Sequence, residues 1–294
     1  MRPQAGNPYR ALKGVRVLSL SLNLPGPAAL LRCRQMGATC VKLEPPAGDP
    51  MALYQRDAYE ILHAGIRVLG ADLKTAPGQK VLQRELKRAD VLLTSFRPSA
   101  LRKLGLDWQA LRKAYPALSL VTIVGAPGAA AEEPGHDLTY LAGNDLVTGL
   151  DLPATLFADM GGALLASEAV LQCVLHQRRK GTGILREVAL SHAAAWLALP
   201  RAWGLTRPGG AVGGGHAGYR VYACADGRVA VAALEPHFAA ALCRAAGVPA
   251  SDMPAMFAPA THSALAKWFA HQTREAIDKI ALEKDIPLRT LPAV

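Results

Sequence analysis

Short apolar runs that alternate with helical segments constrain the fold of this chain more than any other feature. Residues 15–22 (VRVLSLSL) form a β-branched and leucine-rich run with little polar alternation. That pattern is typical of a strand buried on both faces of a parallel sheet. Similar runs lie at 40–43, 66–73, 91–95, 118–124 and 186–190. Because helical segments separate these runs, the sequence predicts an α/β fold with an open parallel, Rossmann-like sheet.

A glycine-rich segment divides the chain. Residues 206–215 (TRPGGAVGGG) break the composition and read as a linker. We therefore expect a large α/β domain over residues 10–205 and a small α+β domain over residues 216–294. In the small domain, Asp226-Gly227 between two apolar runs predicts a β-hairpin, and helices and a final strand follow it.

Composition and charge limit the partners of the chain. The net charge of +10 fits nucleic acid, membrane lipid or a phosphorylated ligand. However, the basic residues are scattered, and 5% aromatic residues leave little stacking surface for single-stranded nucleic acid. No apolar run approaches the ~20 residues of a membrane span. A phosphorylated ligand fits the charge at least as well, although a solvated basic surface accounts for most of these residues. We expect neither nucleic acid nor membrane as a partner.

The cysteines and the N-terminus suggest a compartment. The five cysteines are odd in number and show no CxxC spacing, and MRPQAGNPYR lacks the apolar region of a signal peptide. These features predict reduced thiols in a cytoplasmic protein. No spacing of His, Cys or Asp suggests a metal site.

The stretch from 135 to 180 carries the candidate chemistry. His136 and Asp137 stand at the start of one expected helix, and Asp159 stands at the start of the next, which we expect to begin at about Gly161. An imidazole and a carboxylate from separate elements can remove a proton from one face of a carbon and return one to the other. The N–H groups of Asp159 and Met160 could hold a developing oxyanion. The simpler interpretation is that Asp159 only caps a helix and His136 is an ordinary loop residue.

Two motifs in this stretch resemble a known family. GHDLTYLA at 135–142 and LFADMGGALLA at 156–166 are similar to the central motif pair of the α-methylacyl-CoA racemase branch of the class III CoA-transferase family. The segments at 72–74 (DLK), 96–98 (FRP) and 235–238 (EPHF) extend the likeness. The resemblance implies racemisation of 2-methyl-branched acyl-CoA thioesters through an enolate.

The resemblance also implies roles for individual residues. His136 and Asp159 would be the two acid/base groups, Glu235 would support His136, and Asp137 would orient the assembly or cap its helix. Four further residues would bind CoA, namely Lys74 and its neighbour Leu73, Arg97, and Lys42 in place of an arginine usual in the racemases.

The family also implies how the protein would work and assemble. CoA would be part of the substrate, and no other cofactor would be required. Two chains would interlock as rings in a homodimer. Because the family's C-terminal return segment is absent here, we expect these rings to be open.

Two alternatives remain open at this point. In a CoA-transferase, Asp159 would attack the thioester and form a mixed anhydride. Ser19, Pro45 and the turn that follows residue 124 depart from the family pattern, and a relative that only binds acyl-CoA would tolerate such changes. The presence of both His136 and Glu235 favours the racemase.

Overall fold

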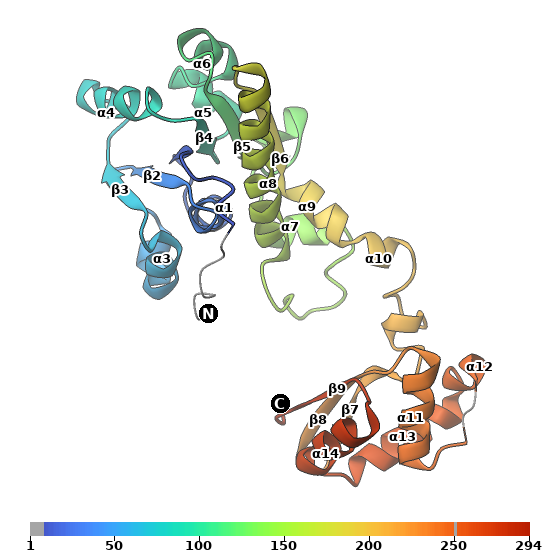
Figure 1. Ribbon diagram of the computed structural model, residues 1–294. Coiled ribbons are helices and arrows are strands. Elements are labelled where there is room, and N and C mark those ends of the chain that lie inside the picture. The colour runs from blue at the N-terminus through green and yellow to red at the C-terminus, as the bar shows by residue number, and fades with distance from the viewer. Residues whose placement is uncertain (1–8, 250–251) are drawn as a thin grey trace. The chain divides into compact units, whose positions relative to one another are not determined.

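The computed structural model describes residues 9–249 and 252–294, and it contains two compact units (Figure 1). Unit 1 ends at Ala198 and unit 2 begins at Leu199. The glycine-rich segment 206–215, which was expected as a linker, therefore lies inside unit 2, where the short 3-10 helix η2 spans Ala211–Gly213.

Unit 1 is built on a six-stranded sheet in which every strand pair is parallel. The strand order is β3-β2-β1-β4-β5-β6, the order of the doubly wound Rossmann fold. The strands are β1 (Arg16–Ser19), β2 (Thr39–Glu44), β3 (Arg67–Gly70), β4 (Val91–Thr94), β5 (Ser119–Val124) and β6 (Leu185–Ala189). The parallel α/β fold predicted from the apolar runs is confirmed.

Helices cover both faces of this sheet (Figure 1). They are α1 (Pro25–Gln35), α2 (Met51–Tyr54), α3 (Arg56–His63), α4 (Ala76–Leu86), α5 (Pro98–Lys103), α6 (Trp108–Ala114), η1 (Gly128–Glu132), α7 (Asp137–Ala142), α8 (Phe157–Lys180) and α9 (Leu190–Leu197). Val17 belongs to the core under α1 and α8, whereas its neighbour Leu18 belongs to the core under α4, α5 and α6. Both faces of the strands are therefore buried, which explains the lack of polar alternation in the sequence.

Helix α8 is the longest helix in the part of the chain that the structure describes. Contrary to the expectation from sequence, its length and hydropathy are those of a membrane span. However, half of its most apolar segment is buried inside the unit, where it packs on α1, α9 and β5. Burial in a protein core accounts for the apolar composition of this helix.

Unit 2 is a small α+β unit with a three-stranded antiparallel sheet in the order β7-β8-β9. The hairpin predicted at Asp226-Gly227 is present, and Ala232 pairs with Tyr219 at its open end. The elements are α10 (Leu199–Ala202), η2, β7 (Tyr219–Cys224), β8 (Gly227–Ala232), α11 (Pro236–Ala246), α12 (Met253–Met256), α13 (Pro259–Ala270), α14 (Arg274–Lys284) and β9 (Leu288–Leu291).

Prolines lie at the boundaries of two helices in unit 1. Pro25 and Pro27 lie in the first turn of α1, where a missing N–H costs nothing because it would have no intrahelical partner. Helix α9 ends at Leu197. Pro200 follows within three residues and cannot continue the helical hydrogen bonds.

Candidate active site

The topology of unit 1 points to one edge of the sheet. The strand order reverses between β1 and β4, and open α/β sheets bind ligands at the carboxyl ends of the strands beside such a reversal. Arg97 is the last residue of the loop between β4 and α5, and Gly125 is the first residue after β5. The start of α7 and the start of α8 lie near the same edge, as the contacts below show.

Asp137 joins the two helices that carry the candidate acid/base groups. His136 is the N-cap residue of α7, and Asp137 is its first helical residue. The Asp137 side chain is buried, and its Oδ1 accepts the backbone N–H of Asp159 at 2.9 Å. The structure therefore brings Asp137 into contact with Asp159 and places His136 near both of them.

Asp159 has an unusual carboxyl group. It is the third residue of α8 and is half-buried. Burial, and next the negative charge of Asp137, raise its pKa to about 6, while the nearby His136 opposes the shift. His136 itself is exposed, and its backbone N–H donates to Thr139 Oγ1 at 3.1 Å. The site thus pairs an accessible imidazole with a carboxyl group that exchanges its proton near neutral pH.

The expected oxyanion hole is not formed by the two N–H groups named from the sequence. The N–H of Asp159 donates to Asp137, and the N–H of Met160 donates to the carbonyl of Leu156 at 3.0 Å. The reason is the start of α8, which lies at Phe157 and not near Gly161. With the earlier start, the N–H of Met160 already belongs to the helical ladder.

Two tyrosines near Asp159 were missed by the sequence analysis. The charge of Asp159 contributes to raising the pKa of both Tyr140 and Tyr54, although burial is the larger cause for each. A side chain on Gly125 or Gly135 would lie within 2.2 or 2.6 Å of the Tyr140 hydroxyl. These glycines therefore make room for Tyr140, and its spacing of four residues from His136 on one helix could have indicated it.

The residues expected to bind CoA lie in different surroundings. Arg97 is exposed at the start of α5, and its charge lowers the pKa of Tyr140 against the effects of burial and Asp159. Arg97 therefore lies within electrostatic reach of Tyr140. Lys74 is exposed in the turn after β3, and its N–H donates to Asp72 Oδ1 at 3.0 Å. Leu73 is half-buried in the same turn, and its carbonyl accepts from Gln79 at 2.6 Å.

The position of Lys42 argues against the expected contact with CoA. Its side chain has no exposed surface. Nζ contacts Glu44 Oε1 at 3.0 Å, Asp49 Oδ2 at 2.5 Å and His63 Nε2 at 2.8 Å. An ammonium has three N–H donors, so all of them are engaged inside the protein. This correction follows from the strand itself, since Lys42 lies in β2, which is buried between β1 and β3.

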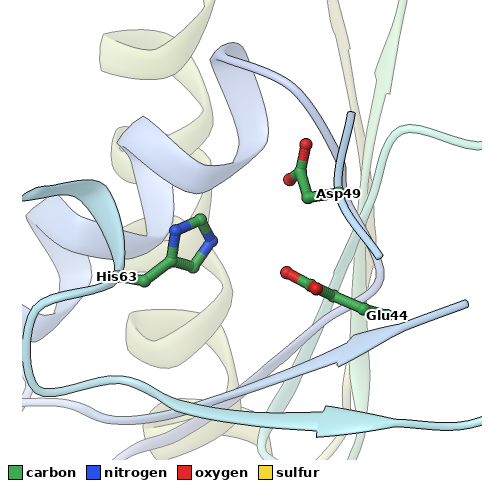
Figure 2. Close-up of side chains that lie close together, drawn as sticks. All are labelled: Glu44, Asp49 and His63. Carbon is green, nitrogen blue, oxygen red and sulfur yellow. The ribbon is translucent and has the colours of Figure 1, made fainter. Parts of the chain in front are cut away.

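The partners of Lys42 form a group that could otherwise hold a cation. Glu44, Asp49 and His63 are buried, and one ligand atom from each lies within 4.8 Å of the others (Figure 2). The sequence analysis expected no metal and missed this group, whose members come from three different segments. The Lys42 ammonium already supplies a positive charge to all three side chains, and a metal ion would have to displace it.

Glu235 belongs to unit 2. It is exposed and is the N-cap residue of α11. Its predicted support of His136, a residue of unit 1, stays a prediction.

Comparisons with known proteins agree with this architecture. The family model of CoA-transferase family III matches residues 12–293. The human alpha-methylacyl-CoA racemase is 29% identical over 83% of this chain and 67% of its own length. The cinnamoyl-CoA:phenyllactate CoA-transferase of Clostridium sporogenes is 30% identical over 62% of this chain and 53% of its own length.

A solved structure supports the fold independently. The crystal structure of the Mycobacterium tuberculosis protein Rv3272 superposes with a TM-score of 0.82 and 23% identity, over 95% of this chain and 84% of that one. Because the family model matches nearly the whole chain, the protein belongs to CoA-transferase family III.

Proposed function

We propose that the protein is a racemase or epimerase that acts on the α-carbon of 2-methyl-branched acyl-CoA thioesters. His136 and Asp159 are the two acid/base groups, and CoA enters only as part of the substrate. The single observation that carries the proposal is the cluster of His136, Asp137 and Asp159 at the start of α7 and α8. Two mammalian alpha-methylacyl-CoA racemases are among the relatives, and matches to them cover 83% and 88% of this chain.

The pKa of Asp159 supports proton transfer in both directions. In a two-base mechanism one group must be deprotonated, to act as the base, and the other protonated, to act as the acid, and the roles exchange with the enantiomer. A carboxyl group with an ordinary pKa is almost fully ionised at neutral pH, so it is a poor acid. Because burial and Asp137 raise the pKa of Asp159 to about 6, a usable fraction of this group is protonated near neutral pH.

CoA transfer between carboxylic acids is the second candidate function. The match to the Clostridium CoA-transferase favours it, and the half-buried Asp159 could attack a thioester to form a mixed anhydride. In that mechanism His136 has no covalent role. A third possibility is a protein that only binds acyl-CoA esters.

Deuterium exchange at the α-carbon separates these functions. We expect the protein to incorporate deuterium from deuterated water into a 2-methylacyl-CoA. Asp159→Ala and His136→Ala should each abolish racemisation, because loss of one positioned acid/base costs ~10²–10⁴ in rate. Each variant should keep residual exchange with only one of the (R) and (S) thioesters.

The transferase makes the contrary forecast for the same variants. Asp159→Ala would abolish acyl exchange onto a free acid, whereas His136→Ala and Glu235→Gln would have mild effects. A fully active His136→Ala protein would therefore rule out the racemase. Absence of both reactions would indicate a protein that only binds acyl-CoA.

We also propose that Arg97 and Lys74 contact the CoA phosphates and that two chains form a homodimer. Exposed apolar side chains beside the candidate site, including Phe157, Met160 and Leu164 of α8, support an acyl chain or a second subunit there. Arg97→Ala should weaken CoA binding roughly tenfold or more, with Arg112→Ala as an exposed control. A monomeric mass in light scattering would refute the homodimer.

A further inference from the structure

A basic hollow lies at the amino ends of the strands in unit 1, at the edge of the sheet opposite the candidate active site. Four arginines line it, and they come from β1, α1, β3 and the segment that follows α4. They are Arg16, Arg34, Arg67 and Arg88. The volume of the hollow is about 500 Å³, within the usual range of small-molecule sites.

The strand register brings two of these arginines to one face of the sheet. Arg16 pairs with Thr39, and Arg67 pairs with Val41. Residues paired in register point to the same face, and Thr39 and Val41 are two residues apart on β2. Arg16 and Arg67 therefore flank β2 on one face, and this face also carries α4, whose end leads to Arg88.

Most of this positive charge is not neutralised by acidic side chains. Arg67 pairs with Glu85 at 2.9 Å, and Glu85 also contacts Arg84. The other acid nearby, Asp90, accepts the backbone N–H of Arg16 at 2.8 Å. Within residues 9–249 and 252–294, the side chains of Arg16, Arg34 and Arg88 have no acidic partner.

The hollow also has the form of an anion site. A side chain on Gly65 would lie 2.4 Å from the Arg34 guanidinium, so this glycine allows the guanidinium to lie against the backbone. Cys40 lines the hollow, but its thiol faces the carbonyl of Leu30 at 3.6 Å. Ala38 and Val41 add some apolar lining, but the only charged groups among the described residues of the lining are four guanidiniums, which suits a compact, multiply charged anion.

We propose that this hollow binds a ligand that carries two or more linked phosphates. Guanidinium groups match phosphate oxygens with paired hydrogen bonds, and three guanidiniums without acidic partners can share several phosphates. The site is separate from the proposed CoA contacts. Strands of four to six residues place roughly 13–20 Å between the two edges of the sheet.

Calorimetric titration of the full chain with inorganic tripolyphosphate tests this site. We expect Arg34→Gln combined with Arg88→Gln to weaken binding at least about tenfold. The matched control is Arg244→Gln combined with Arg289→Gln, which removes the same charge from exposed positions in unit 2. The control and Arg97→Gln should both retain the affinity of the unaltered protein.

Further titrations identify the source of the phosphates. Tighter binding of ATP than of tripolyphosphate would support a nucleotide, and equal binding would support a free polyphosphate. Three results would overturn the proposal. The first is an equal loss of tripolyphosphate affinity in the Arg34/Arg88 double variant and in the control double variant. The second is a loss of that affinity in Arg97→Gln, and the third is binding only of long polyanions such as RNA. The Arg97→Gln result also separates failure of this site from failure of the proposed CoA contacts.

Discussion

Replacement of Lys42 by methionine tests the most strongly charged part of the buried structure. The Lys42 ammonium has no exposed surface and donates to Glu44, Asp49 and His63. His63 Nδ1 lies 2.6 Å from the carbonyl of Tyr59, so it donates there and Nε2 is left to accept from Lys42. Burial lowers the pKa of His63, which keeps this imidazole neutral. Methionine preserves most of the lysine stem but removes the charge and all three donors.

The expected cost follows from the two carboxylates left behind. Breaking a buried ion pair by removing one partner typically costs ~3–5 kcal/mol. Asp49 still accepts the N–H groups of Asn23 and Met51, and Glu44 still accepts from the Tyr59 hydroxyl at 3.0 Å. These contacts limit the loss but do not replace the positive charge. A domain of this size loses about 2–4 °C in Tm per kcal/mol, so we expect a fall of roughly 6–20 °C.

Thermal unfolding by calorimetry measures this loss, and hydrogen exchange of β2 and of residues 20–24 locates it in unit 1. Lys80→Met is the matched control at an exposed position, and it should change stability by less than about 0.5 kcal/mol. Adding Asp49→Asn to Lys42→Met should cost less than the sum of the single changes, by about 0.5–3 kcal/mol. A Lys42→Met protein as stable as the unaltered one would refute the reasoning.

Three further predictions concern the candidate site and its support. Asp159→Asn should stabilise unit 1 by about 1–3 kcal/mol at pH 7.5 but not at pH 4, as measured by urea unfolding. The pKa of Asp159 is raised to about 6 in the folded protein. The stability that the protonated carboxyl group contributes is therefore lost as pH rises from ~4 through ~6. Asp137→Ala should lower the pKa of Asp159 in an NMR titration and destabilise α8 by about 1.5–3 kcal/mol, because the N–H of Asp159 loses a charged acceptor. Gly78→Ala should lower Tm, whereas Gly70→Ala should not, since a side chain at Gly78 would lie 1.9 Å from the Asp72 carbonyl oxygen and one at Gly70 would meet nothing within 4 Å.

The strands could be predicted because burial on both faces requires a continuous run of apolar residues in the sequence. Val17 and Leu18 face different cores, so neither position tolerates a polar residue, and the apolar run follows. Helix ends were less predictable, since Pro25 is compatible both with a turn and with a first helical position. Only the packing of Leu30 and Cys33 in the core under α1 decides between the two.

Lys42 shows why charged residues are hard to assign from sequence. The resemblance implied that Lys42 binds CoA in place of an arginine, and such a role requires an exposed side chain, which is the usual state of lysine. Its actual partners lie up to 21 residues away in the sequence. They converge only because α2 and α3 are inserted between β2 and β3. No local pattern reports such a convergence, and the same reason kept the group of Glu44, Asp49 and His63 out of the sequence analysis.

Asp159 shows that residue types can be predicted while their roles are not. The sequence analysis placed its carboxyl group at a helix start and expected the nearby N–H groups to stabilise an oxyanion. Instead, Asp137 accepts the Asp159 N–H, and the same negative charge contributes to the raised pKa of the Asp159 carboxyl group. The buried carboxylate of Asp137 therefore holds the first turn of α8 by a hydrogen bond and also raises the pKa of the Asp159 carboxyl group on that helix. If proton transfer is the function, the enolate oxygen must be stabilised by groups other than these two N–H groups. Tyr140 is a new candidate, because its hydroxyl occupies the space that Gly125 and Gly135 leave open and its pKa responds to the charge of Asp159.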